Sequence, residues 1–150
     1  MSLTLCLLMT EKFTTEKAPK PVGSYPHARR VDKLLFLSGI GPRDAATNDI
    51  PGNEYDSSGT LIKYDIEAQC HAVFRNVNTV LREAGSSWDQ LVDVVVFLTN
   101  IQNDFAIYNR IYAEYFRDNQ PCRTTVEVKS LPTPIAIELK CIANIADHLT

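Results

Sequence analysis

The stretch that decides the fold is LVDVVVFLTNIQNDFAIYNRIYAEYF, residues 91–116. Its first part, Val92 to Leu98, is a nearly unbroken apolar run of the kind found in strands that are covered on both faces. A helix is predicted to start near Asn103 or Asp104. The aromatic residues of this helix lie on one side, which favours packing in the core over a cofactor site; they are Phe105, Tyr108, Tyr112, Tyr115 and Phe116. The stretch therefore predicts a buried strand followed by an amphipathic helix.

A second amphipathic helix precedes this stretch. Asp65 is predicted to cap its start and Gly85 to end it. Between them, apolar residues recur with helical spacing at Ile66, Cys70, Val73, Phe74, Val77 and Leu81. Such a stripe indicates that one face of the helix packs against a sheet.

Extended segments surround these helices on both sides. Turn residues and alternating apolar positions predict strands over residues 10–17, 28–31, 34–38, 123–129 and 135–145. The order ββαβαββ predicts an α+β domain with one mixed sheet and two helices on one face. The other sheet face stays bare, so we expect a homo-oligomer to cover it. Residues 39–64 form a long polar loop, a kind of segment that is often functional.

Composition supports a single folded domain over residues 10–150, preceded by a short extension, residues 1–9. The 150 residues are 45% hydrophobic and 22% charged, and the net charge is −3, which argues against a nucleic-acid partner. The apolar segment from Leu3 to Met9 is too short to span a membrane and lacks the features of a signal peptide. We therefore expect a cytoplasmic protein.

The sequence signatures of metal and nucleotide sites are absent. Four cysteines and three histidines include no C-x-x-C or H-x-x-x-H spacing. Gly39 and Gly41 begin like a dinucleotide fingerprint, but Asp44 stands where the third glycine belongs. We expect no metal and no organic cofactor. Cys122 and Cys141 are predicted to act as small apolar residues.

Two charged residues stand out in the C-terminal strands. Arg123 begins a strand of the buried type, where it either grips a carboxylate of a ligand or pairs with a structural acid. Glu138 is flanked by apolar neighbours, so it serves either as a general acid and base or in an ion pair. By residue type and position alone, His27 is a surface loop histidine rather than a catalytic one.

Several motifs together carry a family resemblance. They are Gly23-Ser24-Tyr25, the strand from Leu34 to Gly39, Asp65-Ile66-Glu67-Ala68-Gln69, Asp104-Phe105-Ala106 with Asn109, the run Arg123-Thr124-Thr125-Val126-Glu127-Val128, and Ile137-Glu138. Over about residues 19 to 146, the chain resembles the Rid family, also called YjgF-type proteins, which are reactive enamine and imine deaminases.

The resemblance implies a fold, an assembly and a reaction. We expect a chorismate-mutase-like trimer with clefts between subunits, which hydrolyses enamines or imines to 2-oxo acids and ammonia without a cofactor. In this chain Arg123 would bind the substrate carboxylate, and Glu138 would position or activate water. Tyr25 and Asn109 would line the cleft, and the backbone at Gly39 would contact the substrate.

One site position departs from the family pattern. Thr125 stands where many family members have cysteine, so its backbone groups, and no thiol, would contribute to the cleft.

The long loop, residues 41–64, resembles the 2-aminomuconate deaminase branch of this family. That enzyme converts a dicarboxylic enamine to 4-oxalocrotonate and ammonia, so its substrate needs a second carboxylate anchor. The candidates for this anchor are Arg43, Arg29, Arg30 and His27. The main functional prediction is therefore 2-aminomuconate deaminase.

Other functions remain open at the level of sequence. The first alternative is a general 2-iminoacid deaminase that acts on smaller substrates such as 2-aminoacrylate. The second is a non-catalytic trimer that binds ligands or acts like a chaperone. The acidic charge balance argues against a ribonuclease, which should present a basic face.

Overall fold

A computed structural model describes residues 9–145 of the chain. The six-stranded sheet has the order β1-β2-β3-β8-β6-β7. Its strands are β1 (Thr10–Phe13), β2 (Ala28–Val31), β3 (Leu34–Leu37), β6 (Leu91–Leu98), β7 (Cys122–Glu127) and β8 (Ile137–Asn144). Only β6 and β7 among them pair in parallel, so the sheet is mixed. The predicted α+β class is confirmed. The strand predicted from residue 10, which the order ββαβαββ does not count, is the edge strand β1.

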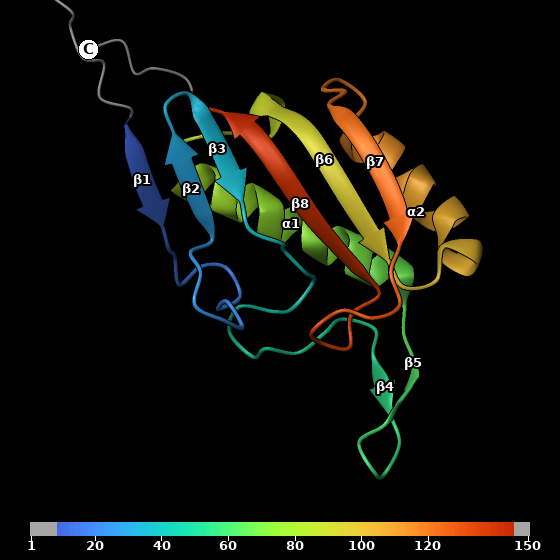
Figure 1. The fold of residues 1–150 in the computed structure, drawn as a ribbon. Coiled ribbons are helices and arrows are strands. Elements are labelled where there is room, and N and C mark those ends of the chain that lie inside the picture. Colours follow the sequence, from blue (N-terminus) through green and yellow to red (C-terminus); the bar gives the residue numbers. More distant parts are fainter. Residues whose placement is uncertain (1–8, 146–150) are drawn as a thin grey trace, which may run out of the picture.

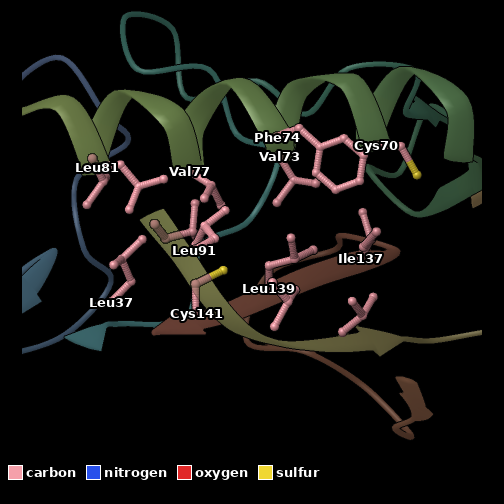
Figure 2. Close-up of a cluster of buried hydrophobic side chains, with 14 of the residues drawn as sticks. Leu37, Cys70, Val73, Phe74, Val77, Leu81, Leu91, Ile137, Leu139 and Cys141 are labelled. Atoms are coloured by element: carbon pink, nitrogen blue, oxygen red, sulfur yellow. The ribbon is translucent and has the colours of Figure 1, made fainter. Parts of the chain in front are cut away.

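The two helices, α1 (Ile66–Glu83) and α2 (Ile101–Tyr115), lie on the same face of the sheet, as Figure 1 shows. In α1 the Asp65 side chain accepts a hydrogen bond from the Ala68 amide, and Gly85 follows the helix with a positive φ of 79°. The predicted bounds of this helix are therefore confirmed. Its apolar stripe points at the sheet, where it meets Leu37, Leu139 and Cys141 (Figure 2).

The start of α2 differs from the prediction. Asn100 is the N-cap, and its side chain accepts a hydrogen bond from the Asn103 amide. Glu127, at the end of β7, accepts a second one from the Ile101 amide at 2.7 Å. Each side chain satisfies an amide of the first turn that has no partner within the helix, so the helix begins at Ile101, two or three residues earlier than predicted. Within the aromatic stripe, Tyr108, Tyr112 and Phe116 are buried and belong to the core, whereas Phe105 and Tyr115 are partly exposed.

The sheet face opposite the helices is uncovered in the single chain. In β6 the helix-side residues are buried, while Val95 and Phe97 are only half-buried, so this strand is not covered on both faces as predicted. The prediction of a buried strand at Arg123 is also wrong. Because β7 is the edge strand beside β6, five of its six residues, including Cys122, are exposed. Cys141 is buried as predicted.

The long loop carries a small hairpin, β4 (Glu54–Tyr55) with β5 (Leu61–Lys63), which projects from the body of the molecule (Figure 1). Its base is tied to α1 through the fully buried Gln69, whose amide donates to Asn53 Oδ1 at 2.8 Å. Asn53 in turn donates to the Pro134 carbonyl, and Gln69 Oε1 accepts from the Ala136 amide. The helix thereby fixes both the loop and the segment that leads into β8.

Several predicted segments have other bounds in the structure or fall outside the described residues. The strands predicted over 34–38, 123–129 and 135–145 span 34–37, 122–127 and 137–144. The first strand stops at Phe13 instead of residue 17, because the Thr15 amide donates to the ring of His27 and not to a neighbouring strand. Of the predicted N-terminal extension, only Met9 is described. No helix described within residues 9–145, neither α1, α2 nor the short 3-10 helix η1 (Trp88–Gln90), is long and apolar enough to cross a membrane.

Candidate functional site

A pocket of about 390 Å³ opens where β3 ends and β8 begins. Three loops complete its walls: the one before β2, the one after Gly39, and the one that leads into β8. The lining residues are Val22, Tyr25, Ser38, Gly39, Gly41, Arg43, Pro132, Thr133, Ile135, Glu138 and Lys140. Four of the residues predicted for the site, Tyr25, Gly39, Arg43 and Glu138, are thus brought together.

Glu138 is the only carboxylic acid among the lining residues. Its side chain is half-buried and has no hydrogen-bond or ion-pair partner within residues 9–145. Burial raises the pKa of this carboxyl group above its ordinary value of 4.5. No residue described by the structure serves as the partner for a structural ion pair, so the acid is free to exchange protons with a ligand.

Gly39 lies against this acid. A Cβ atom at position 39 would come within 2.9 Å of Glu138 Cδ and closer still to its Oε1. Glycine is therefore required for the carboxyl group to occupy its position. The close approach places the Gly39 backbone beside Glu138, where the family resemblance implies substrate contacts.

Two cations share the pocket with the acid. Arg43 donates to the Lys20 carbonyl at 2.8 Å and to Asn48 Oδ1. Lys140, which sequence reasoning did not select for the site, donates from Nζ to the Leu37 carbonyl at 2.9 Å. The sequence does contain a signal for Lys140, because this residue stands two positions after Glu138 and therefore lies on the same face of the strand.

His27 is the clearest correction to the predicted site. It is 5% exposed, and it is neither a surface histidine nor a residue of the pocket lining. Nδ1 accepts from the Thr15 amide, so Nε2 carries the hydrogen and donates to the Pro19 carbonyl at 2.9 Å. Because both ring nitrogens are engaged, His27 holds the chain between β1 and β2 in place and is withdrawn as a carboxylate anchor.

The remaining predicted residues gather at a different place, between α2 and β7. Arg123 donates from Nη1 to Asn109 Oδ1 at 2.8 Å, and its guanidinium carbon lies 4.7 Å from the centre of the Tyr112 ring. Thr125 Oγ1 is 3.3 Å from the Tyr108 hydroxyl. The guanidinium is thus oriented by an amide and an aromatic face, with donors left for an anion.

Arg123 and Glu138 do not converge within one chain. Arg123 pairs with Val94, which is buried beneath the helices, whereas Glu138 pairs with Phe97 on the open face. Since residues paired across neighbouring strands point to the same side, the two charges lie on opposite faces of the sheet. The sequence alone does not determine this register.

A second cavity, of about 370 Å³, adjoins the first. Pro132, Thr133 and Ile135 line both, so the loop before β8 is a wall shared by the two cavities. Within residues 9–145, no three side chains of histidine, cysteine, aspartate or glutamate are grouped as metal ligands.

Comparisons with known proteins identify the family to which this chain is similar. A family model described as endoribonuclease L-PSP matches residues 15–145. A RutC family protein of Pyrococcus abyssi is 40% identical over 133 residues, which are 89% of this chain and 95% of the relative. The chloroplastic Reactive Intermediate Deaminase A of Arabidopsis thaliana is 31% identical over 145 residues, which cover 97% of this chain and 71% of the relative.

Solved structures agree. The crystal structure of YyfA from Yersinia pestis, described as a protein of the conserved Rid family, superimposes with a TM-score of 0.79 at 33% identity and covers 91% of this chain and 100% of that one. Fold and site thus define a small α+β protein with an acid-bearing pocket. The chain belongs to the endoribonuclease L-PSP family, which includes the RutC and Rid proteins. The resemblance to the Rid family is therefore confirmed, whereas the names of the relatives give no support to the 2-aminomuconate deaminase branch.

Proposed function

We propose that the protein is a deaminase that hydrolyses reactive enamines and imines of 2-amino acids to 2-oxo acids and ammonia. The observation that carries this proposal is the Glu138 carboxyl group, which is half-buried, has no partner in the described chain and lies against Gly39 in an open pocket. The name of the Arabidopsis relative supports the same reaction class. This general reading is the alternative of the sequence analysis, and the names of the relatives favour it over 2-aminomuconate.

The reaction follows from the residues. After the enamine tautomerises to the imine, water adds to the protonated C=N carbon while Glu138 accepts one of its protons. The resulting carbinolamine carries a hydroxyl and an amino group on one carbon. Glu138 returns the proton to the amino group, which leaves as ammonia; the hydroxyl group then gives its proton to the Glu138 carboxylate as its C–O bond becomes a carbonyl. One carboxyl group thus serves both steps.

Arg123 completes the proposed site by binding the carboxylate beside the reacting carbon, with Asn109 holding its guanidinium. Since Arg123 and Glu138 of one chain lie on opposite sheet faces, the cleft requires Arg123 from a second copy. The trimer implied by the resemblance would supply it and would also cover the open face. The roles of Tyr25 and Thr125, the absence of a cofactor and the cytoplasmic location stay predictions.

The test is ammonia release from 2-aminoacrylate, measured above the rate of spontaneous hydrolysis. Glu138→Gln keeps the shape but removes the proton shuttle, so kcat should fall by about 10²-fold or more. Glu11→Gln, an exposed acid of β1, is the matched control and should leave kcat unchanged. Hydrolysis of RNA, with no ammonia release, would instead favour the activity in the family description.

A further inference from the structure

The two cations that line the pocket, Lys140 and Arg43, have no acidic partner in the part of the chain that the structure describes. Lys140 donates to the Leu37 carbonyl, and Arg43 donates to the Lys20 carbonyl and the Asn48 side chain. All of these acceptors are neutral, and within residues 9–145 neither cation forms an ion pair. The pocket therefore holds two positive charges that no carboxylate of residues 9–145 neutralises directly.

Both cations are held in place with donors to spare. The ammonium group of Lys140 has three N–H donors and uses one on the end of β3. The guanidinium of Arg43 has five and uses two on the loops that form the pocket rim. Because backbone carbonyls anchor both groups, part of the cost of ordering them for a ligand is already met in folding.

The two cations and the acid lie at different positions in the pocket, so they can contact different parts of a ligand. Lys140 lies one strand repeat beyond Glu138 on the same face of β8, and Arg43 comes from the loop after Gly41. A ligand whose reacting carbon lies at Glu138 would therefore place its far end near positive charge. The donors that remain on Lys140 and Arg43 match a carboxylate.

We propose that Lys140, together with Arg43, binds a second acidic group of the substrate, so that the enzyme prefers dicarboxylic enamines or imines. This inference rests on the proposed function, in which Arg123 binds the carboxylate beside the imine. Of the anchors expected from sequence, Arg43 is retained, whereas His27 is engaged elsewhere and Arg29 and Arg30 do not line the pocket. Lys140 takes their place as the specificity-determining residue.

The kinetic test compares kcat/KM for 2-aminomuconate with that for 2-aminoacrylate. In Lys140→Met the ratio of the two values should fall by about 10-fold or more, because the ligand's second carboxylate loses a charged donor. Lys140→Arg should restore part of it. Lys12→Met, an exposed lysine of β1, is the control and should leave the ratio unchanged.

Lys140 also bridges β3 and β8, so a purely structural role is the competing explanation. That role predicts equal losses on both substrates together with a lower melting temperature, and this outcome would overturn the proposal. An unchanged ratio in Lys140→Met would overturn it as well.

A binding measurement separates this inference from the proposed function. Calorimetric titration with adipate and with hexanoate, which differ by one carboxylate, should show adipate binding at least about 10-fold more tightly, and Lys140→Met should remove the difference. If the protein binds adipate in this way but releases no ammonia, the deaminase proposal fails and the anion site stands. Turnover of 2-aminoacrylate without any preference for adipate refutes the site alone.

Discussion

Gly39 has no side chain at the point where the backbone passes closest to the Glu138 carboxyl group. In Gly39→Ala, the added methyl group would meet the end of a flexible side chain, which can rotate away. We therefore expect the fold to persist and the carboxyl group to move. Because a displacement of about 1 Å can cost on the order of 10²-fold in rate, kcat should fall by roughly that factor.

Steady-state kinetics and thermal melting of Gly39→Ala check this expectation together. A normal kcat would show that the carboxyl group does not act from its observed position. A melting temperature that falls along with kcat would assign Gly39 to stability.

Burial of Glu138 also makes stability depend on pH in a defined direction. Because the pKa of this group is raised in the folded protein, the protonated form is favoured there, and the stabilisation present below pH 4.5 is lost as the pH rises through the raised value. The Glu138→Gln variant has no carboxyl group to ionise, so it does not lose this stabilisation as the pH rises. Its melting temperature should match that of the wild type at pH 4 and exceed it at pH 8.

The reverse order of melting temperatures at pH 8 would mean that a partner stabilises the charged carboxylate. In the assembled protein, such a partner would come from a second copy. The same titration predicts that the rate rises with pH, because the ionised carboxylate that accepts a proton from water is formed as the pH passes the raised pKa of Glu138.

At the scale of elements, the start of α2 is set by two caps from different parts of the chain, Asn100 and Glu127. Asn100→Ala removes one acceptor of the first turn and should cost about 1 kcal/mol of unfolding free energy. Asn103→Ala is the matched control. Asn103 belongs to the first turn of the helix and its side chain is exposed, so the free energy of unfolding should change by no more than about 0.5 kcal/mol.

Urea denaturation of both variants distinguishes the observed helix start from the predicted one. A larger loss in Asn103→Ala than in Asn100→Ala would return the start of the helix to the position that the sequence suggested.

Sequence periodicity was sufficient for the elements whose signals are local. The cap at Asp65, the stripe of α1 and the alternation of Ile137, Glu138 and Leu139 depend on neighbours within a few residues, and all three are confirmed. The long-range contacts were not predictable in this way. The second cap of α2 comes from Glu127, 26 residues away, and a loop histidine gives no sign that its ring will bind two backbone segments.

The candidate site shows the same difference between local signals, which the sequence reveals, and long-range contacts, which it does not. Glu138, Gly39 and Tyr25 were found because they belong to recognisable motifs, whereas Lys140 was passed over although its strand face was known. Whether Arg123 meets Glu138 depends on register across three strands, which no single segment encodes. The structure settles this point by placing the two on opposite faces.

At the scale of the whole molecule, the placement of Arg123 and Glu138 on opposite faces of the sheet can be tested by mixing subunits. Arg123→Ala and Glu138→Gln should each be inactive alone. If every cleft takes Arg123 from one copy and Glu138 from the next, co-refolding the two variants at equal amounts leaves about a quarter of the clefts intact, and about a quarter of wild-type activity should return.

Sedimentation of the mixture establishes that the variants have assembled together. No recovery of activity in a mixed assembly would contradict a cleft shared between copies, and a stable monomer with full activity would remove the need for a second copy altogether.

The loop before β8 is a thin partition, since Pro132, Thr133 and Ile135 each face both cavities. A molecule that pushes this partition from one side changes the space left on the other. Where an occupant of one cavity displaces this loop, the two cavities become coupled in free energy, and by reciprocity each occupant then alters the affinity for the other by the same factor. A compound bound remote from Glu138 would in this way tune the pocket without entering it.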